Sequence, residues 1–141
     1  MDQAQINALK AGRDDRDIKA MHERFISELE TAVLLKSEIG TMSVSSTSIS
    51  CDCLGHKITA AYRPVAVDRN ICAMEYDFLV KWKKDELSIL RLYLQANGTL
   101  TRDAGGTVKF QDFNNTYNKG HILAVVCSSL LASPVFTPAE G

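Results

Sequence analysis

Residues 71–82 read ICAMEYDFLVKW, and this stretch decides the fold. Apolar and polar side chains alternate along most of it, which is the pattern of a strand that buries one side. Burying each large side chain is worth about 1.5–3 kcal/mol, so the apolar side must face the core. That side carries Cys72, Met74, Tyr76, Phe78, Val80 and Trp82.

Neighbouring segments show the same alternation, so the sequence predicts a sheet. We expect strands over 42–53, 57–67, 71–82 and 86–95, with a fifth over 99–102 or 107–110. The dipeptide Asn97-Gly98 is the strongest hairpin signal, because both residues tolerate positive φ. Short connections throughout favour an up-and-down antiparallel meander, since parallel neighbours need long crossovers.

Helical patterns flank these strands. Residues 15–38 repeat apolar side chains at three- and four-residue spacing, which predicts a long helix ended by Gly40. Its start would be capped by Asp14 or Asp15, and Gly12 would separate it from a short or frayed first segment.

A second helix is predicted over 116–132. Asn115 or Thr116 would cap it, and Ser133-Pro134 would stop it. It is apolar nearly all round, so we expect it to be buried on most sides, within the domain or against a second copy.

The predicted fold class is therefore α+β. A long N-terminal helix, a four- to five-stranded antiparallel meander sheet and an apolar C-terminal helix follow one another, with both helices on one face of the sheet. Residues 1–14 would form a flexible or short helical arm, residues 15–133 a single α+β domain, and residues 134–141 a loose tail.

Bulk properties exclude some classes of partner. The formal net charge of −1 argues against nucleic acid and against an anionic membrane surface, because both require excess Lys and Arg. The apolar run over 121–133 is too short to span a bilayer. The N-terminus lacks the pattern of a signal peptide, so we expect a cytoplasmic protein whose four cysteines are free thiols.

The side of the sheet opposite the apolar one is the candidate binding surface. Three-residue loops at 68–70 and 83–85 would pair Arg63 with Glu75 and Asp77 with Arg91. The outward cluster would comprise Arg63, Glu75, Asp77, Arg91 and Tyr93, with Ala61, Val65, Ala73, Leu79 and Ile89 on the same side. Such a surface is either a solvated face with paired charges or a recognition surface for a polar ligand, a partner protein or a second copy.

Cys51, Cys53 and His56 form the only spacing typical of a metal site. Alternate strand residues point the same way, so two sulfurs and an imidazole could converge on zinc. A fourth ligand is missing nearby, and two half-buried thiols beside a turn histidine explain the pattern equally. We therefore expect no metal and no cofactor.

The sequence contains few signals of function. No histidine has an identifiable acid or nucleophile partner, so we expect a non-enzymatic protein-binding module, in the form of a homodimer. The layout is similar to that of small bacterial adaptor, chaperone and immunity proteins, although no motif ties the chain to a family. The alternative is a small-molecule-binding protein or enzyme with a pocket between the first helix and the sheet, lined by Tyr62, Met74, Tyr76 and Trp82.

Overall fold

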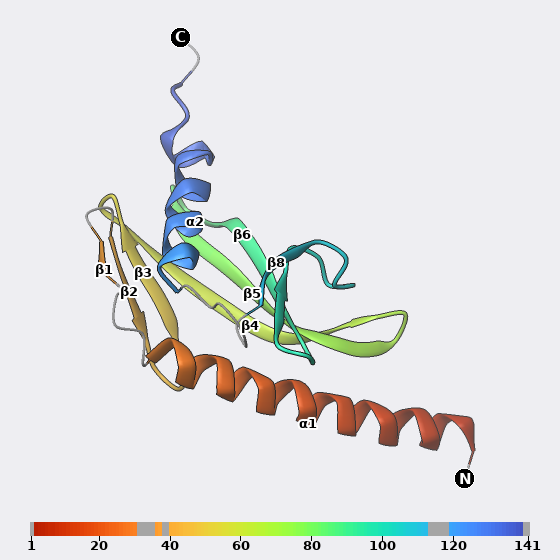
Figure 1. The fold of residues 1–141 in the computed structure, drawn as a ribbon. Coiled ribbons are helices and arrows are strands. Elements are labelled where there is room, and N and C mark those ends of the chain that lie inside the picture. The colour runs from red at the N-terminus through yellow and green to blue at the C-terminus, as the bar shows by residue number, and fades with distance from the viewer. Residues whose placement is uncertain (1, 31–35, 38–39, 113–118, 140–141) are drawn as a thin grey trace. The chain divides into compact units, whose positions relative to one another are not determined.

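The computed structural model describes residues 2–30, 36–37, 40–112 and 119–139. Within them the chain is α+β, with a long first helix, eight strands, a second helix and a short 3₁₀ helix (Figure 1). The bounds are α1 Gln3–Glu30, β1 Lys36–Ser37, β2 Gly40–Val44, β3 Ile49–Cys53, β4 His56–Val67, β5 Asn70–Trp82, β6 Asp85–Gln95, β7 Thr99–Thr101, β8 Lys109–Asp112, α2 Lys119–Leu131 and η1 Pro134–Phe136.

The strands form one sheet in the order of the sequence, from β1 to β8. The pairs β1–β2, β2–β3, β3–β4, β6–β7 and β7–β8 are antiparallel. Short connections therefore predicted the antiparallel arrangement correctly. The strand count exceeds the predicted four to five.

The chain divides into two compact units, each made of three segments. Unit 1 comprises Met1–Phe25, Tyr62–Tyr76 and Leu92–Tyr117. Unit 2 comprises Ile26–Ala61, Asp77–Arg91 and Asn118–Gly141.

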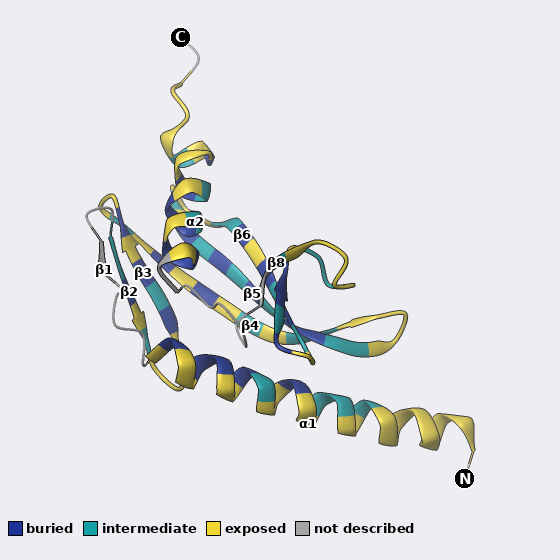
Figure 2. Ribbon diagram, viewed as in Figure 1, coloured by how far each residue is buried: buried dark blue, intermediate teal, exposed yellow. Residues whose placement is uncertain are grey.

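Buried residues of α1 and of the strands form the core of unit 1 (Figure 2). Phe25 packs against Tyr76 with ring centroids 5.2 Å apart, and His22 lies against Tyr62. The buried members of this core are Ile18, His22, Phe25, Ala73, Met74, Tyr76, Leu92, Leu94, Leu100 and Thr101. The helix therefore packs on the side of the strands that carries Tyr62 and Tyr76.

The core of unit 2 lies between α2 and the neighbouring strands. A disulfide between Cys53 of β3 and Cys127 of α2 links the two elements. In the β3–β4 pair, Cys51 lies opposite Ile58. The buried strand and helix residues include Met42, Ile49, Cys51, Cys53, Ile58, Ala60, Phe78, Val80, Leu90, Ile122, Leu123, Val126, Cys127 and Leu130.

One side of α2 faces solvent, so within the chain this helix is not buried all round, and its expected burial against a second copy stays a prediction. His121 is exposed, and Leu131 keeps 56% of its surface accessible. Neither helix in the described part of the chain has the length and apolar composition needed to cross a bilayer.

The first helix begins twelve residues earlier than predicted, because its cap lies at Asp2. The Asp2 carboxylate accepts from the Gln5 backbone N–H at 2.8 Å, and the Gln5 side chain accepts from the Asp2 N–H at 3.0 Å. This reciprocal pair is a capping box. Gly12 does not interrupt α1, and Gly40 lies in β2 rather than at the end of the helix. Residues 31–35 and 38–39 lie outside the described residues.

The long first strand predicted over 42–53 is wrong, because a turn over Ser45–Ser48 divides it into β2 and β3. The backbone N–H of Ser45 donates to Ser48 O at 2.9 Å, and Ser48 N–H also donates to the Ser45 hydroxyl. Serine side chains form such local bonds readily, which favours a turn over a continued strand. The proposed caps Asn115 and Thr116 lie outside the described residues.

Candidate functional site

The outward side of the strands in unit 2 is open to solvent. On β4, Lys57, Thr59 and Ala61 are exposed, whereas the intervening Ile58 and Ala60 are 0% and 5% accessible. On β5, Lys81 is exposed next to the buried Val80. This alternation is what a strand with one covered and one uncovered side requires.

A groove of about 480 Å³ lies on this outward side. We call it the β4–β5 groove, and its lining is Gly55, His56, Lys57, Thr59, Ala61, Leu79, Val80, Lys81 and Glu86. Ala61 and Leu79 supply apolar surface, as the sequence predicted for the outward side. Charge comes from two lysines and one glutamate, so the groove carries a net positive charge.

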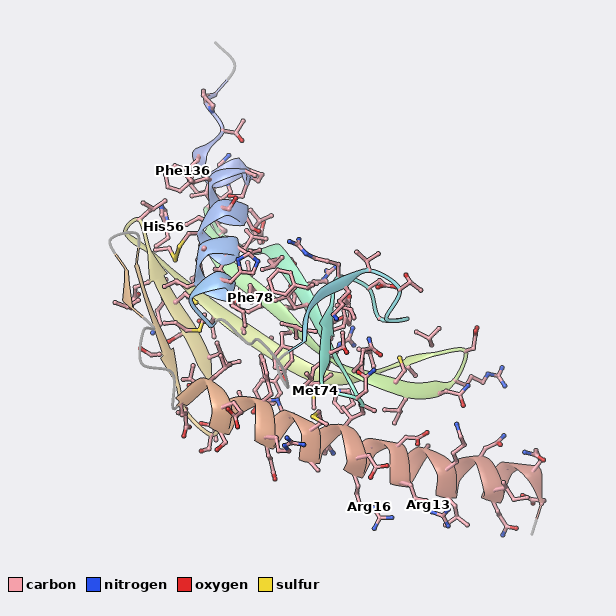
Figure 3. All side chains as sticks on the ribbon, viewed as in Figure 1. Arg13, Arg16, His56, Met74, Phe78 and Phe136 are labelled. Atoms are coloured by element: carbon pink, nitrogen blue, oxygen red, sulfur yellow. A yellow bond between two sulfur atoms is a disulfide. The ribbon has the colours of Figure 1, made fainter. Side chains whose placement is uncertain are left out.

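The groove extends to the loop between β3 and β4. Leu54 and Gly55 form this turn with φ of 51° and 82°, and the adjoining His56 lines the groove. The His56 ring meets Phe136 of η1 edge-on, with centroids 5.5 Å apart (Figure 3). His56 lies opposite Cys53 across β3 and β4, so its ring is on the side of the strands that faces α2.

Asp77 is the hub of a polar cluster in unit 2. Its carboxylate accepts a short hydrogen bond from the Ser88 hydroxyl and lies 3.6 Å from Arg91 Nε. The predicted pairing of Asp77 with Arg91 is confirmed. The bond to Asp77 places the Ser88 side chain on the same side of the strands as that carboxylate.

The second predicted pair lies in unit 1. Arg63 Nε donates to Glu75 Oε1 at 3.2 Å, so this pairing is also confirmed. The Arg63 side chain is 73% exposed, and ion pairs this exposed contribute about 0–1 kcal/mol. Tyr93 is half-buried and lies opposite Thr101 across β6 and β7.

The loops that were assumed in deriving these pairs are one residue shorter than predicted. Asp68-Arg69 separates β4 from β5, and Lys83-Lys84 separates β5 from β6. The φ values of Asp68, Arg69 and Lys83 are 50°, 66° and 59°, in the left-handed region that two-residue hairpins require. Non-glycine residues adopt this region of backbone conformation at a cost in energy.

Ala73 was predicted on the outward side and is instead fully buried. It and the next residue, Met74, are 0% and 2% accessible, so strict alternation fails at this point of β5. Of the other predicted apolar residues, Ala61 is exposed, whereas Val65, Leu79 and Ile89 are half-buried.

The cysteines proposed as zinc ligands are not available to a metal in this structure. Cys53 is bonded to Cys127, and burial together with the charge of Asp52 raises the pKa of the Cys51 thiol to about 12. No group of three metal-ligating side chains exists within the described residues. The expectation of four free thiols is wrong, because packing of α2 on β3 brings Cys127 to Cys53.

A buried polar pair in unit 1 was missed by the sequence reasoning. His22 is 7% accessible. Its Nδ1 shares a 2.7 Å hydrogen bond with the Tyr76 hydroxyl, and its ring lies 4.3 Å from that of Tyr62. Burial lowers the pKa of His22, against the opposing charge of Glu23. The imidazole therefore fills the space between two tyrosines that were suggested as pocket walls.

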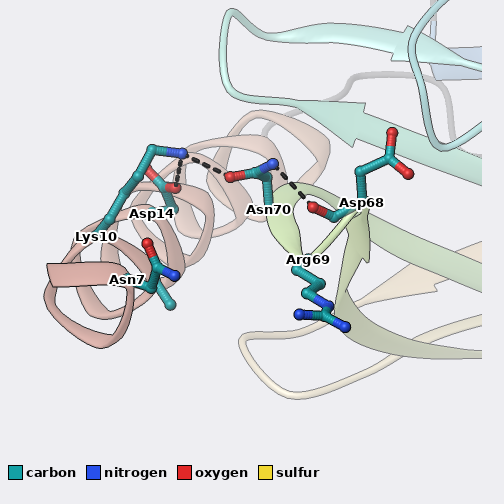
Figure 4. A pocket seen from close by; sticks show the side chains of 7 residues that line it. Asn7, Lys10, Asp14, Asp68, Arg69 and Asn70 are labelled. Carbon is teal, nitrogen blue, oxygen red and sulfur yellow. Dashed lines mark hydrogen bonds and ion pairs between the residues drawn. The ribbon is translucent and has the colours of Figure 1, made fainter. Parts of the chain in front are cut away.

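A different pocket lies in unit 1, between α1 and the β4–β5 hairpin (Figure 4). It has a volume of about 300 Å³ and is lined by Asn7, Lys10, Ala11, Asp14, Asp68, Arg69 and Asn70. Lys10 Nζ donates to Asn70 Oδ1 at 2.9 Å and lies 3.4 Å from Asp14. Two basic side chains and two carboxylates therefore line the same pocket, namely Lys10, Arg69, Asp14 and Asp68.

Comparison of the chain with protein-family models, curated proteins and solved structures finds no match. The candidate binding sites of the chain are the β4–β5 groove of unit 2 and the polar pocket of unit 1.

Proposed function

We propose that this chain is a non-enzymatic protein-binding module, of the adaptor, chaperone or immunity type. The outward side of its strands binds the partner. The binding residues are Arg63, Glu75, Asp77, Arg91 and Tyr93, together with those of the β4–β5 groove. No cofactor takes part.

The observation that carries this proposal is the exposure of alternate residues on β4. Lys57, Thr59 and Ala61 stay in water although Ile58 and Ala60 between them are buried. Exposed apolar surface combined with charge is typical of surfaces that bind proteins. The half-buried Leu79 in the same groove adds to that apolar surface.

The module would act as a homodimer. Support comes from apolar side chains that remain accessible at the end of α2 and in η1, namely Leu131 at 56% and Phe136 at 40%. Burial of such residues against a second copy would be favourable by the hydrophobic effect. Light scattering of the purified chain should give twice the chain mass, and a monomer at all concentrations would remove the dimer from the proposal.

Affinity capture from an extract of the source cells tests the proposed face. The bait is the full chain, and the variant Arg63→Glu/Arg91→Glu reverses two exposed charges on strands. The matched control is Arg13→Glu/Arg16→Glu, which reverses two exposed charges on α1 (Figure 3).

A partner identified by mass spectrometry should be lost with the strand variant and retained with the α1 control. Retention of that partner by both variants would eliminate the outward face as its binding surface. Circular dichroism of each variant establishes that the fold is kept.

The second candidate function is small-molecule binding, and the polar pocket of unit 1 supports it. Lys10 and Arg69 would bind an anionic group, while Asp14 and Asp68 would bind a cationic one. A zwitterionic metabolite fits this description. Native mass spectrometry of the protein purified from its own cells should then show an adduct that Lys10→Ala/Arg69→Ala abolishes, and its absence would dismiss this candidate.

A further inference from the structure

We infer that the β4–β5 groove binds an acidic, extended segment of the partner protein, with Lys57 and Lys81 as the two residues that receive its carboxylates. The inference rests on the proposed function and specifies the chemistry of the partner. It follows from the charge, the exposure and the apolar lining of the groove.

The two lysines of the groove form no ion pair within the part of the chain that the structure describes. Lys57 and Lys81 are exposed on adjacent strands, and Asp52 of β3 lies opposite Lys57 in the strand register. Two ammonium groups that line one groove repel each other, and like charges on neighbouring strands are destabilising. A carboxylate placed between them would remove that repulsion, whereas a basic partner would increase it.

The adjoining hairpin strengthens this preference. Lys83 and Lys84 form the loop directly after β5, and Lys83 Nζ lies 5.9 Å from the centroid of the Trp82 ring. Lysines therefore continue from the groove to the end of the hairpin. Glu86 offsets part of this charge and would exclude a second acidic group from its own side of the groove.

The lining selects a polypeptide rather than a polyanion. Ala61 and Leu79 give the groove an apolar part that aliphatic side chains can bury against. Nucleic acid and anionic membranes bind through many cations, and the net charge of −1 supplies no such excess. An acidic peptide with interspersed aliphatic residues would match both the lysines and the apolar residues of the groove.

Selection from a random peptide library displayed on phage tests the inference with the full chain as target. Selected sequences should be enriched in Asp and Glu with aliphatic neighbours. Their affinity should fall about tenfold for Lys57→Gln/Lys81→Gln, which corresponds to about 1.4 kcal/mol. The control Lys109→Gln removes an exposed lysine of β8 and should leave affinity unchanged.

Failure to select any sequence, or selection without acidic enrichment, would overturn the inference. Single-stranded DNA and phosphatidylserine vesicles are tested alongside the peptides. Binding of either that is lost with Lys57→Gln/Lys81→Gln would assign the groove to a polyanion and would also overturn it.

Capture from extract separates this inference from the proposed function. If the partner is lost with Arg63→Glu/Arg91→Glu but retained with Lys57→Gln/Lys81→Gln, the face binds a protein and the groove does not bind its acidic segment. If both variants retain the partner, the outward face itself is excluded.

Discussion

His22 and Tyr76 form a buried hydrogen bond that joins α1 to β5 in unit 1. The imidazole Nδ1 and the phenol oxygen are 2.7 Å apart, and the two residues are 7% and 1% accessible. A buried polar group is costly when it lacks a partner, so the pair fixes how the helix lies on the strands. The contact of His22 with Tyr62 adds ring packing to the same place.

Tyr76→Phe should lower the free energy of unfolding by about 1–3 kcal/mol, because it leaves the buried imidazole nitrogen without this partner. Urea denaturation measures the loss. The double variant His22→Phe/Tyr76→Phe removes both polar groups, so it should cost less than the sum of the two single variants. Additive losses would mean that the hydrogen bond contributes nothing.

Stability should decrease in mild acid because of His22. Burial lowers the pKa of this residue in the folded chain below its ordinary value of 6.5, despite the opposing effect of Glu23. Between the two pKa values the unfolded chain binds a proton that the folded chain does not, so the free energy of unfolding falls as the pH drops below 6.5. His22→Phe should flatten this part of the pH profile. An unchanged profile would contradict the assignment.

Thiol labelling should distinguish the four cysteines. Cys51 should resist alkylation at neutral pH because burial and Asp52 raise its pKa to about 12, whereas the half-buried Cys72 should react slowly. Unfolding without reductant should expose two thiols, and unfolding with reductant four. Four thiols without reductant would exclude the bond between Cys53 and Cys127.

Gly40→Ala should destabilise the chain, because its Cβ would meet the Asp52 carbonyl oxygen in the paired strand β3. We expect a loss of about 1–3 kcal/mol. The control is Gly12→Ala in α1, where nothing lies within 4 Å of the added Cβ. Alanine is the better helix former, so this variant should gain about 0.5–1 kcal/mol. Chemical denaturation of both variants compares them, and equal effects would refute the close approach at Gly40.

The sheet was largely predictable, because period-two alternation depends only on local geometry. The strands around 57–67, 71–82 and 86–95 follow from apolar residues at every second position. The ion pairs of Arg63 and Arg91 were predicted from an assumed register, and both are present although each loop is one residue shorter than assumed. Two adjacent buried residues, Ala73 and Met74, could not be foreseen, since alternation assumes a regular strand.

Other features depend on tertiary packing. The partners Cys53 and Cys127 are separated by 74 residues, and no spacing rule connects them. Burial of His22 likewise depends on the strands that meet α1. The capping box of Asp2 and Gln5, in contrast, does not depend on tertiary packing, because its residues are three apart in the sequence. The helix start was predicted at Asp14 or Asp15 instead. The cytoplasmic location and the homodimer stay predictions.

Lysine acetylation followed by mass spectrometry tests the central claim most directly. The chain is labelled alone and in complex with the partner obtained by capture. Lys57 and Lys81 should be protected in the complex, while Lys19 on α1 and Lys109 on β8 should label equally in both states. Equal labelling of Lys57 and Lys81 with and without the partner would contradict binding at the outward face.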